Sequence, residues 1–135
     1  MSSVLGFGML VDVFDPKELS HLRKEGLPWE MTKGRNTFCP ISEFTPSKDI
    51  GDPYGHEVYL EINGKEVRKT STRELHMGLE DAMHHVSGSM TLSPGDIIAV
   101  KIKGCEGTLA TGDEVEAGIS SVGIVRNRIG PPSRG

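Results

Sequence analysis

Asp12 is the first residue in the chain whose position suggests chemistry. It is a carboxylate inside VLGFGMLVDVF, residues 4–14, where almost every other side chain is apolar. An unpaired charge is costly to bury, so an aspartate in a buried strand needs a metal, a lysine or several N–H donors as partners. The alternative is that Asp12 ends a strand and caps a turn, because Asp15 and Pro16 follow closely. The sequence leaves both interpretations open.

Lys33 is the obvious cationic counterpart of Asp12. It lies in PWEMTKGRNTFCPISEF, residues 28–44, an irregular segment in which aromatic and apolar residues surround the charges. Lysine side chains are usually solvated, and composition alone predicts that Lys33 is a solvated turn residue. A charge partner at Asp12 would instead make Lys33 a cation held in a pocket.

Other titratable residues give weaker predictions. His84 and His85 are adjacent on an expected helix, so their side chains point about 100° apart and cannot share a metal from one face. Glu114 and Glu116 share one face of an expected strand, and such a pair can bind a divalent cation. The same alternation is typical of a half-exposed strand, and we interpret the glutamates as a solvated face.

Composition limits the class of protein. The chain has 135 residues, of which 36% are hydrophobic and 25% charged, and this composition suits one globular domain. We expect the domain over residues 1–130 and a disordered tail over residues 131–135. The net charge of −4 and the lack of a basic cluster argue against a nucleic-acid-binding surface. No apolar run approaches the roughly 20 residues that a membrane-spanning helix needs. Cys39 and Cys105 form no CxxC pair, so we expect buried thiols and a cytoplasmic protein.

The elements that must position Asp12 and Lys33 are mostly strands. Residues 4–14 read as a strand buried on both faces, and Asn63-Gly64 predicts a type I′ turn between two alternating runs. Further strands are expected over residues 95–104, 113–120 and 122–129.

Helical signals are fewer. The one clear helix is expected over residues 71–90, with Ser71 and Glu74 as a capping box, while Asp15 is a plausible N-cap for about one turn. These patterns predict a mainly β, α+β chain: a roll or sandwich with one flanking helix. The buried first strand needs neighbours, which predicts a partner chain or an oligomer.

Several segments in order resemble the fumarylacetoacetate hydrolase (FAH) family. They are VLGFGMLVDVF, LPWEMTKGRNTFCPISEF, the DIGDP turn, EINGKEVRKTST, MTLSPGDII and GDEVEAGISSVGIVRNRI, and together they cover roughly residues 4–129. The resemblance implies a β-roll of mixed sheets, usually in a homodimer. It also implies a divalent cation, Mg²⁺ most often or else Mn²⁺ or Ca²⁺, that chelates a 2-oxo or β-diketo acid. Family members hydrolyse C–C bonds, decarboxylate, isomerise or hydrate such acids.

The resemblance also implies roles for four residues. Asp12 falls where the family has a metal-binding aspartate, and Lys33 where it has a lysine beside the metal that contacts the substrate enolate. Asn36 and Thr37 are expected to line the substrate pocket.

Three segments depart from the family's pattern at its site. The family's upstream E-x-E pair of metal ligands is not present before Asp12, the S-A-R-D type segment reads FDPK at residues 14–17, and the T-G-T-P type loop is replaced by AVKIK at residues 99–103. Two hypotheses follow. Either another chain supplies the missing carboxylates in a homo- or hetero-oligomer, making an enzyme for a small oxo-acid, or the protein is a non-catalytic structural or regulatory subunit. A stand-alone binding module is a weaker third.

Overall fold

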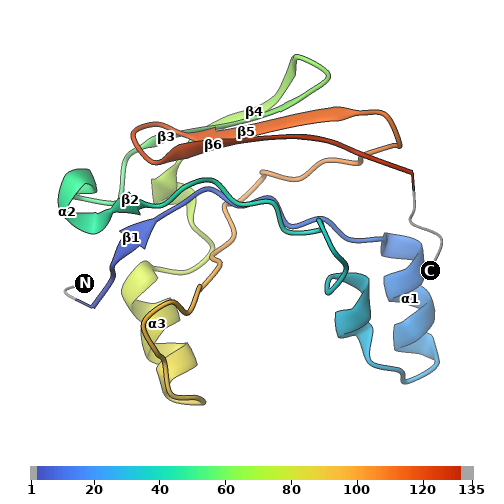
Figure 1. Cartoon of the computed structure of the whole chain (residues 1–135), viewed down its shortest axis with the longest axis horizontal. Coiled ribbons are helices and arrows are strands. Elements are labelled where there is room, and N and C mark those ends of the chain that lie inside the picture. Colours follow the sequence, from blue (N-terminus) through green and yellow to red (C-terminus); the bar gives the residue numbers. More distant parts are fainter. Residues whose placement is uncertain (1–2, 132–135) are drawn as a thin grey trace.

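The largest layer of the structure is a four-stranded antiparallel sheet. The computed structural model describes residues 3–131, and its sheet has the order β4-β3-β5-β6 (Figure 1). The strands are β3 (Glu57–Ile62), β4 (Lys65–Ser71), β5 (Glu114–Ile119) and β6 (Gly123–Arg128). The predicted hairpin joins β3 to β4: Asn63 and Gly64 have φ of 53° and 70°, the positive values that a type I′ turn requires.

One face of this sheet carries the hydrophobic core. The inward side chains of Leu60, Val115 and Ala117 form a buried cluster, because alternate residues of neighbouring strands point to the same face. Met9 and Val11 belong to the N-terminal segment, residues 4–14, and pack against this cluster. Fully burying a side chain such as that of Leu60 or Val115 stabilises the fold by about 1.5–3 kcal/mol. The core therefore anchors residues 9–11, next to Asp12, on the sheet.

The N-terminal segment forms a second, smaller layer. Strand β1 (Gly6–Phe7) pairs antiparallel with β2 (Thr45–Pro46), and residues 8–13 continue alongside residues 38–44 (Figure 1). The prediction of a strand buried on both faces over residues 4–14 is wrong. Only two of these residues are in a strand, and Leu5 is 73% exposed. Met9 and Val11 pack on the core cluster, whereas Leu5 and Phe14 are exposed and the other apolar side chains of the segment are half-buried.

Two nine-residue helices lie at opposite ends of this layer (Figure 1). Helix α1 (Pro16–Lys24) is longer than the single turn expected, and Asp15 is its N-cap as predicted, accepting hydrogen bonds from the N–H groups of Lys17 and Glu18. The remaining helical elements are short: η1 (Trp29–Thr32), α2 (Ser47–Ile50) and η2 (Thr72–Glu74).

Helix α3 (Leu79–Ser87) begins eight residues after Ser71, so the predicted capping box is wrong. Ser71 accepts instead from the N–H of Arg73 in the short turn η2. Leu75 forms a β-bridge with Ile102, and the His76 N–H donates to the Lys101 carbonyl over 2.7 Å. These long-range bonds hold residues 75–76 extended and delay the helix.

The fold class predicted from the sequence is confirmed: a mainly β, α+β chain with few helices. The strand expected over residues 95–104 is wrong, because these residues are irregular apart from the bridge at Ile102. Within residues 3–131, no helix is long and apolar enough to cross a bilayer. Residues 132–135 of the expected tail lie outside the described part of the chain.

Candidate functional site

Asp12 and Lys33 meet in an ion pair between the N-terminal segment and the end of η1. Asp12 Oδ2 accepts a hydrogen bond from Lys33 Nζ. Asp12 is positioned by its neighbours: the N–H groups of Val11 and Val13 donate to the carbonyls of Pro40 and Phe38 over 3.1 and 2.9 Å. The predicted lysine partner for Asp12 is therefore present in the structure.

Lys33 is placed by the compact turn η1. Its N–H donates to the Glu30 carbonyl over 3.0 Å, and the fully buried Thr32 donates its hydroxyl to the Trp29 carbonyl over 2.7 Å. The Lys33 ammonium lies 5.3 Å from the centroid of the Phe14 ring, within the range of a cation–π interaction. Two groups thus orient Lys33, one carboxylate and one aromatic ring.

The pair remains open to solvent. The side chains of Lys33 and Asp12 are 40% and 50% exposed, so the expectation of a buried charge at Asp12 is wrong. Lys33 is neither freely solvated nor enclosed: it is held by contacts on one side and accessible on the other. An accessible, oriented ammonium can bind an anionic oxygen of a ligand.

Asn36 and Thr37 lie on the turn that follows Lys33. The Phe38 N–H donates to the Arg35 carbonyl over 3.2 Å and closes this turn, and Thr37 has φ of 71°. A β-branched residue in the left-handed region is strained by about 1–3 kcal/mol. Both side chains are exposed, and neither lines the cavity that contains Asp12 and Lys33.

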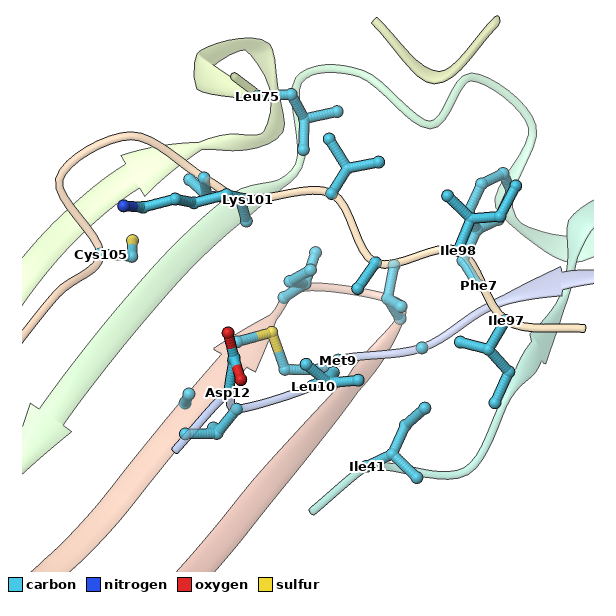
Figure 2. Close-up of a pocket in the computed structure, with 18 of the residues that line it drawn as sticks. Phe7, Met9, Leu10, Asp12, Ile41, Leu75, Ile97, Ile98, Lys101 and Cys105 are labelled. Atoms are coloured by element: carbon cyan, nitrogen blue, oxygen red, sulfur yellow. The ribbon is translucent and has the colours of Figure 1, made fainter. Parts of the chain in front are cut away.

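The cavity beside the ion pair has a volume of about 1630 Å³. Figure 2 shows its walls: Met9, Leu10 and Asp12 of the N-terminal segment lie across from Leu75, Ile98 and Lys101. Most of the lining is apolar, and Lys33 and Asp12 supply charges on one wall. Small-molecule pockets usually measure about 300–1,000 Å³, so this cavity is large for one small ligand.

The described residues do not by themselves make a metal centre. Within residues 3–131, no three side chains of His, Cys, Asp or Glu are close enough together to hold an ion. Mg²⁺ prefers six oxygen ligands and Ca²⁺ six to eight, whereas Asp12 offers one carboxylate that Lys33 already engages. A divalent cation here would need oxygen ligands from other groups.

A second charged cluster, on the four-stranded sheet, was missed from the sequence. Glu116 accepts hydrogen bonds from Tyr59 Oη over 2.7 Å and from Arg126 Nε over 2.5 Å. The Arg126 guanidinium holds the pKa of Glu116 below its usual range, while the hydrogen bond to Glu116 raises the pKa of Tyr59 to about 12. The expectation of a solvated face is therefore wrong for Glu116, which is half-buried and held by two partners, whereas Glu114 is exposed as expected.

Of the remaining candidates, Cys105 lines the cavity, and the others lie outside it. His84 and His85 are exposed in the last turn of α3. Cys39 and Cys105 form no disulfide. Cys39 is exposed and Cys105 is half-buried, so the prediction of two buried thiols is wrong.

Comparisons with known proteins agree on one family. The family model described as fumarylacetoacetate (FAA) hydrolase C-terminal matches residues 1–130. An uncharacterized protein of Pyrococcus abyssi is 33% identical over 126 residues, which are 93% of this chain and 56% of the relative. The mitochondrial oxaloacetate tautomerase FAHD1 of Rattus norvegicus is 30% identical over 129 residues, 96% of this chain and 58% of that protein.

A solved structure gives the same fold. Fumarylpyruvate hydrolase from Pseudomonas aeruginosa, in complex with Mn²⁺ and pyruvate, superposes with a TM-score of 0.82 at 21% identity. The match covers 96% of this chain and 55% of that one. The chain thus spans less than three-fifths of the length of these proteins.

Proposed function

The chain belongs to the fumarylacetoacetate hydrolase family, and from this premise we propose that it is part of an enzyme acting on 2-oxo or β-diketo acids. The substrate names of the relatives support that class, since oxaloacetate and fumarylpyruvate are both 2-oxo acids. The observation that carries the proposal is the Asp12–Lys33 pair, oriented at the wall of a large cavity and open to solvent.

The chemistry of these acids requires a cation at the oxo oxygen. Tautomerisation, decarboxylation and C–C hydrolysis of a 2-oxo acid all develop negative charge on that oxygen. An ammonium held in place by Asp12 and Phe14 stabilises this charge without reorganising during the reaction. Lys33 would therefore contact the enolate. Asn36 and Thr37, which lie outside the cavity, would touch only a substrate that extends over the exposed turn after Lys33.

A divalent cation fits this proposal only in a completed site. Mg²⁺, or else Mn²⁺ or Ca²⁺, would polarise the oxo group, and Asp12 would be one of its ligands. Since the described residues offer no ligand set of their own, the other oxygens must come from outside them. We place them on another polypeptide, in a homo- or hetero-oligomer.

A non-catalytic structural or regulatory subunit is the second candidate. It is favoured by the single carboxylate at Asp12, which Lys33 already neutralises. The two functions differ in metal dependence.

The deciding experiment is turnover of oxaloacetate by the oligomer as it is isolated, with Mg²⁺ or Mn²⁺ added or chelated. Metal-dependent turnover that is lost in Asp12→Asn and kept in Glu57→Gln supports the enzyme. Glu57 is the matched control because it forms an exposed ion pair with Lys69 on the sheet. Absence of turnover and of metal binding by calorimetry would leave the non-catalytic subunit.

A further inference from the structure

Two cations line the cavity on the side of α1 and η1, and each lies over an aromatic ring. The Arg23 guanidinium lies 5.7 Å from the centroid of the Trp29 ring. The Lys33 ammonium lies 5.3 Å from that of Phe14. All four side chains line the cavity. Both separations are within the range of a cation–π interaction, so each ring helps to orient its cation.

The end of α1 brings Arg23 and Trp29 together. Gly26 has φ of 66°, and its N–H donates to the Arg23 carbonyl over 3.4 Å. The Leu27 N–H donates to the Leu22 carbonyl over 2.9 Å, which completes a Schellman motif at the end of the helix. The chain then turns back, and η1 packs beside α1 (Figure 1). The position of Arg23 over Trp29 therefore follows from the backbone of this helix end.

Arg23 is the cation of the cavity whose charge is not matched. The carboxylates that line the cavity all have partners: Asp12 with Lys33, Glu106 with Lys101, and Asp96 with the N–H of Ser93. Within residues 3–131, no carboxylate oxygen lies within 4.0 Å of the Arg23 guanidinium. A guanidinium presents a planar fork of N–H donors that matches a carboxylate in a bidentate hydrogen bond. Arg23 is thus free to take a carboxylate from a ligand.

The wall between the two cations is apolar. Leu19 precedes Arg23 by one helical turn on α1, and it lines the cavity together with the rings of Phe14 and Trp29. The turn η1 has four residues, and at about 2 Å per residue roughly 8 Å of backbone separates Trp29 from Lys33. A cation, an apolar stretch and a second cation therefore follow one another along this wall.

We propose that Arg23 binds the distal carboxylate of a diacid substrate whose 2-oxo end lies at Lys33. The hydrocarbon part of the substrate packs on Leu19 and the two rings. Lys33 keeps donors for the oxo end, because an ammonium has three N–H groups and Asp12 accepts from one. A long diacid fits better than oxaloacetate, since its carboxylate must reach from Lys33 to Arg23. This inference rests on the proposed function for the 2-oxo end, but recognition of the distal carboxylate can be measured without turnover.

The test uses the full chain and two unreactive probes with the same number of carbons, the diacid adipate and the monoacid hexanoate. Trp29 is the only tryptophan in the sequence and lies under Arg23, so its fluorescence reports on ligands at Arg23. We expect adipate to bind about tenfold or more tightly than hexanoate, because its second carboxylate adds a charge-assisted, bidentate hydrogen bond. Succinate, which is shorter, should bind more weakly than adipate. Calorimetry gives the same affinities and the stoichiometry.

Matched variants locate the site. Arg23→Met removes the guanidinium and should abolish the preference for adipate over hexanoate. Arg23→Lys keeps the charge without the planar fork and should keep part of the preference. Lys24→Met is the control, because Lys24 is exposed in the same turn of α1 and lies outside the cavity lining. Since both positions are exposed, all three variants should keep the circular dichroism spectrum of the parent.

Three results would overturn the inference: no binding of adipate, equal binding of adipate and hexanoate, or a preference that Arg23→Met and Lys24→Met change to the same extent. Turnover of oxaloacetate together with any of these results keeps the proposed function and removes the role of Arg23. A preference for adipate that depends on Arg23, without turnover of an oxo-acid, keeps the carboxylate site and removes the proposed function.

Discussion

Asp12 and Lys33 are 21 positions apart in the sequence, and the ammonium of one donates directly to the carboxylate of the other. Two independent elements create this contact, the N-terminal segment and the turn η1. Both side chains stay substantially exposed, so the ion pair contributes only about 0–1 kcal/mol to stability. The arrangement therefore matters more for a ligand than for the fold.

The first prediction separates those two roles. Lys33→Met removes the ammonium group and keeps an unbranched side chain that is one atom shorter. In the protein as isolated we expect kcat/KM for oxaloacetate to fall by about 10²–10³-fold, the loss typical of one transition-state donor. The midpoint of urea unfolding should barely move. Lys69→Met, which breaks the exposed pair with Glu57, is the control and should leave both quantities unchanged; equal losses in the two variants would contradict a role for Lys33.

The second prediction concerns the strain at Thr37. Thr37→Gly removes the strain of a β-branched residue at φ of 71° and should raise the free energy of unfolding by about 1 kcal/mol. This value allows for the conformational entropy that glycine adds to the unfolded chain. Thr111→Gly is the control, because Thr111 is exposed in a turn without a positive φ and glycine there should give no gain. If Thr37 also contacts substrate, the stabilised variant will have a higher KM. A loss of stability in Thr37→Gly would show that its hydroxyl or methyl group makes contacts that outweigh the strain.

Local signals in the sequence predicted local structure well. Asn63-Gly64 gave the hairpin and Asp15-Pro16 gave the start of α1, because both depend only on backbone preferences of adjacent residues. The capping box at Ser71 failed because Leu75 is held by Ile102, a partner that no local pattern reveals. Burial of residues 4–14 failed for a related reason, since it depends on which other elements cover each face of the segment, and no local pattern reveals them.

The candidate site was predicted in part. Opposite charges in apolar surroundings indicated that Asp12 and Lys33 could pair, but their exposure follows from tertiary packing. The cluster of Tyr59, Glu116 and Arg126 was missed although a signal existed. Glu116 and Arg126 are equidistant from Ser121 in the turn between β5 and β6, and a hairpin with that centre pairs them directly.

The third prediction tests the electrostatics of that cluster. Glu116→Gln keeps an acceptor for Tyr59 but removes the negative charge, so the pKa of Tyr59 should fall from about 12 towards its ordinary value of 10. The tyrosinate absorbance in the ultraviolet measures this change, in a Tyr54→Phe background so that one tyrosine titrates. Glu114→Gln on the same strand is the control and should leave the titration unchanged.

The raised pKa of Tyr59 also makes the stability of the fold depend on pH. Tyr59 keeps its proton in the folded state up to about 12 but loses it near 10 when unfolded. Between those values the folded state binds more protons, so stability falls as pH rises. Glu116→Gln should therefore flatten the decline of unfolding free energy with pH in this window. A parallel decline in parent and variant would contradict the link.

The fourth prediction concerns the close approach of Tyr59 to Gly118. A Cβ at position 118 would lie 2.4 Å from Cε1 of the Tyr59 ring, which is too close for any real contact. Gly118→Ala must displace the ring and should destabilise the fold by about 1–3 kcal/mol, the usual cost of overpacking. Gly130→Ala, where no atom lies within 4 Å, is the control and should cost little. In a Tyr59→Ala background the cost of Gly118→Ala should largely disappear, because the ring that a new Cβ would meet is gone. A double-mutant cycle of urea unfolding measures this coupling, and additive effects would show that the clash is relieved elsewhere in the sheet.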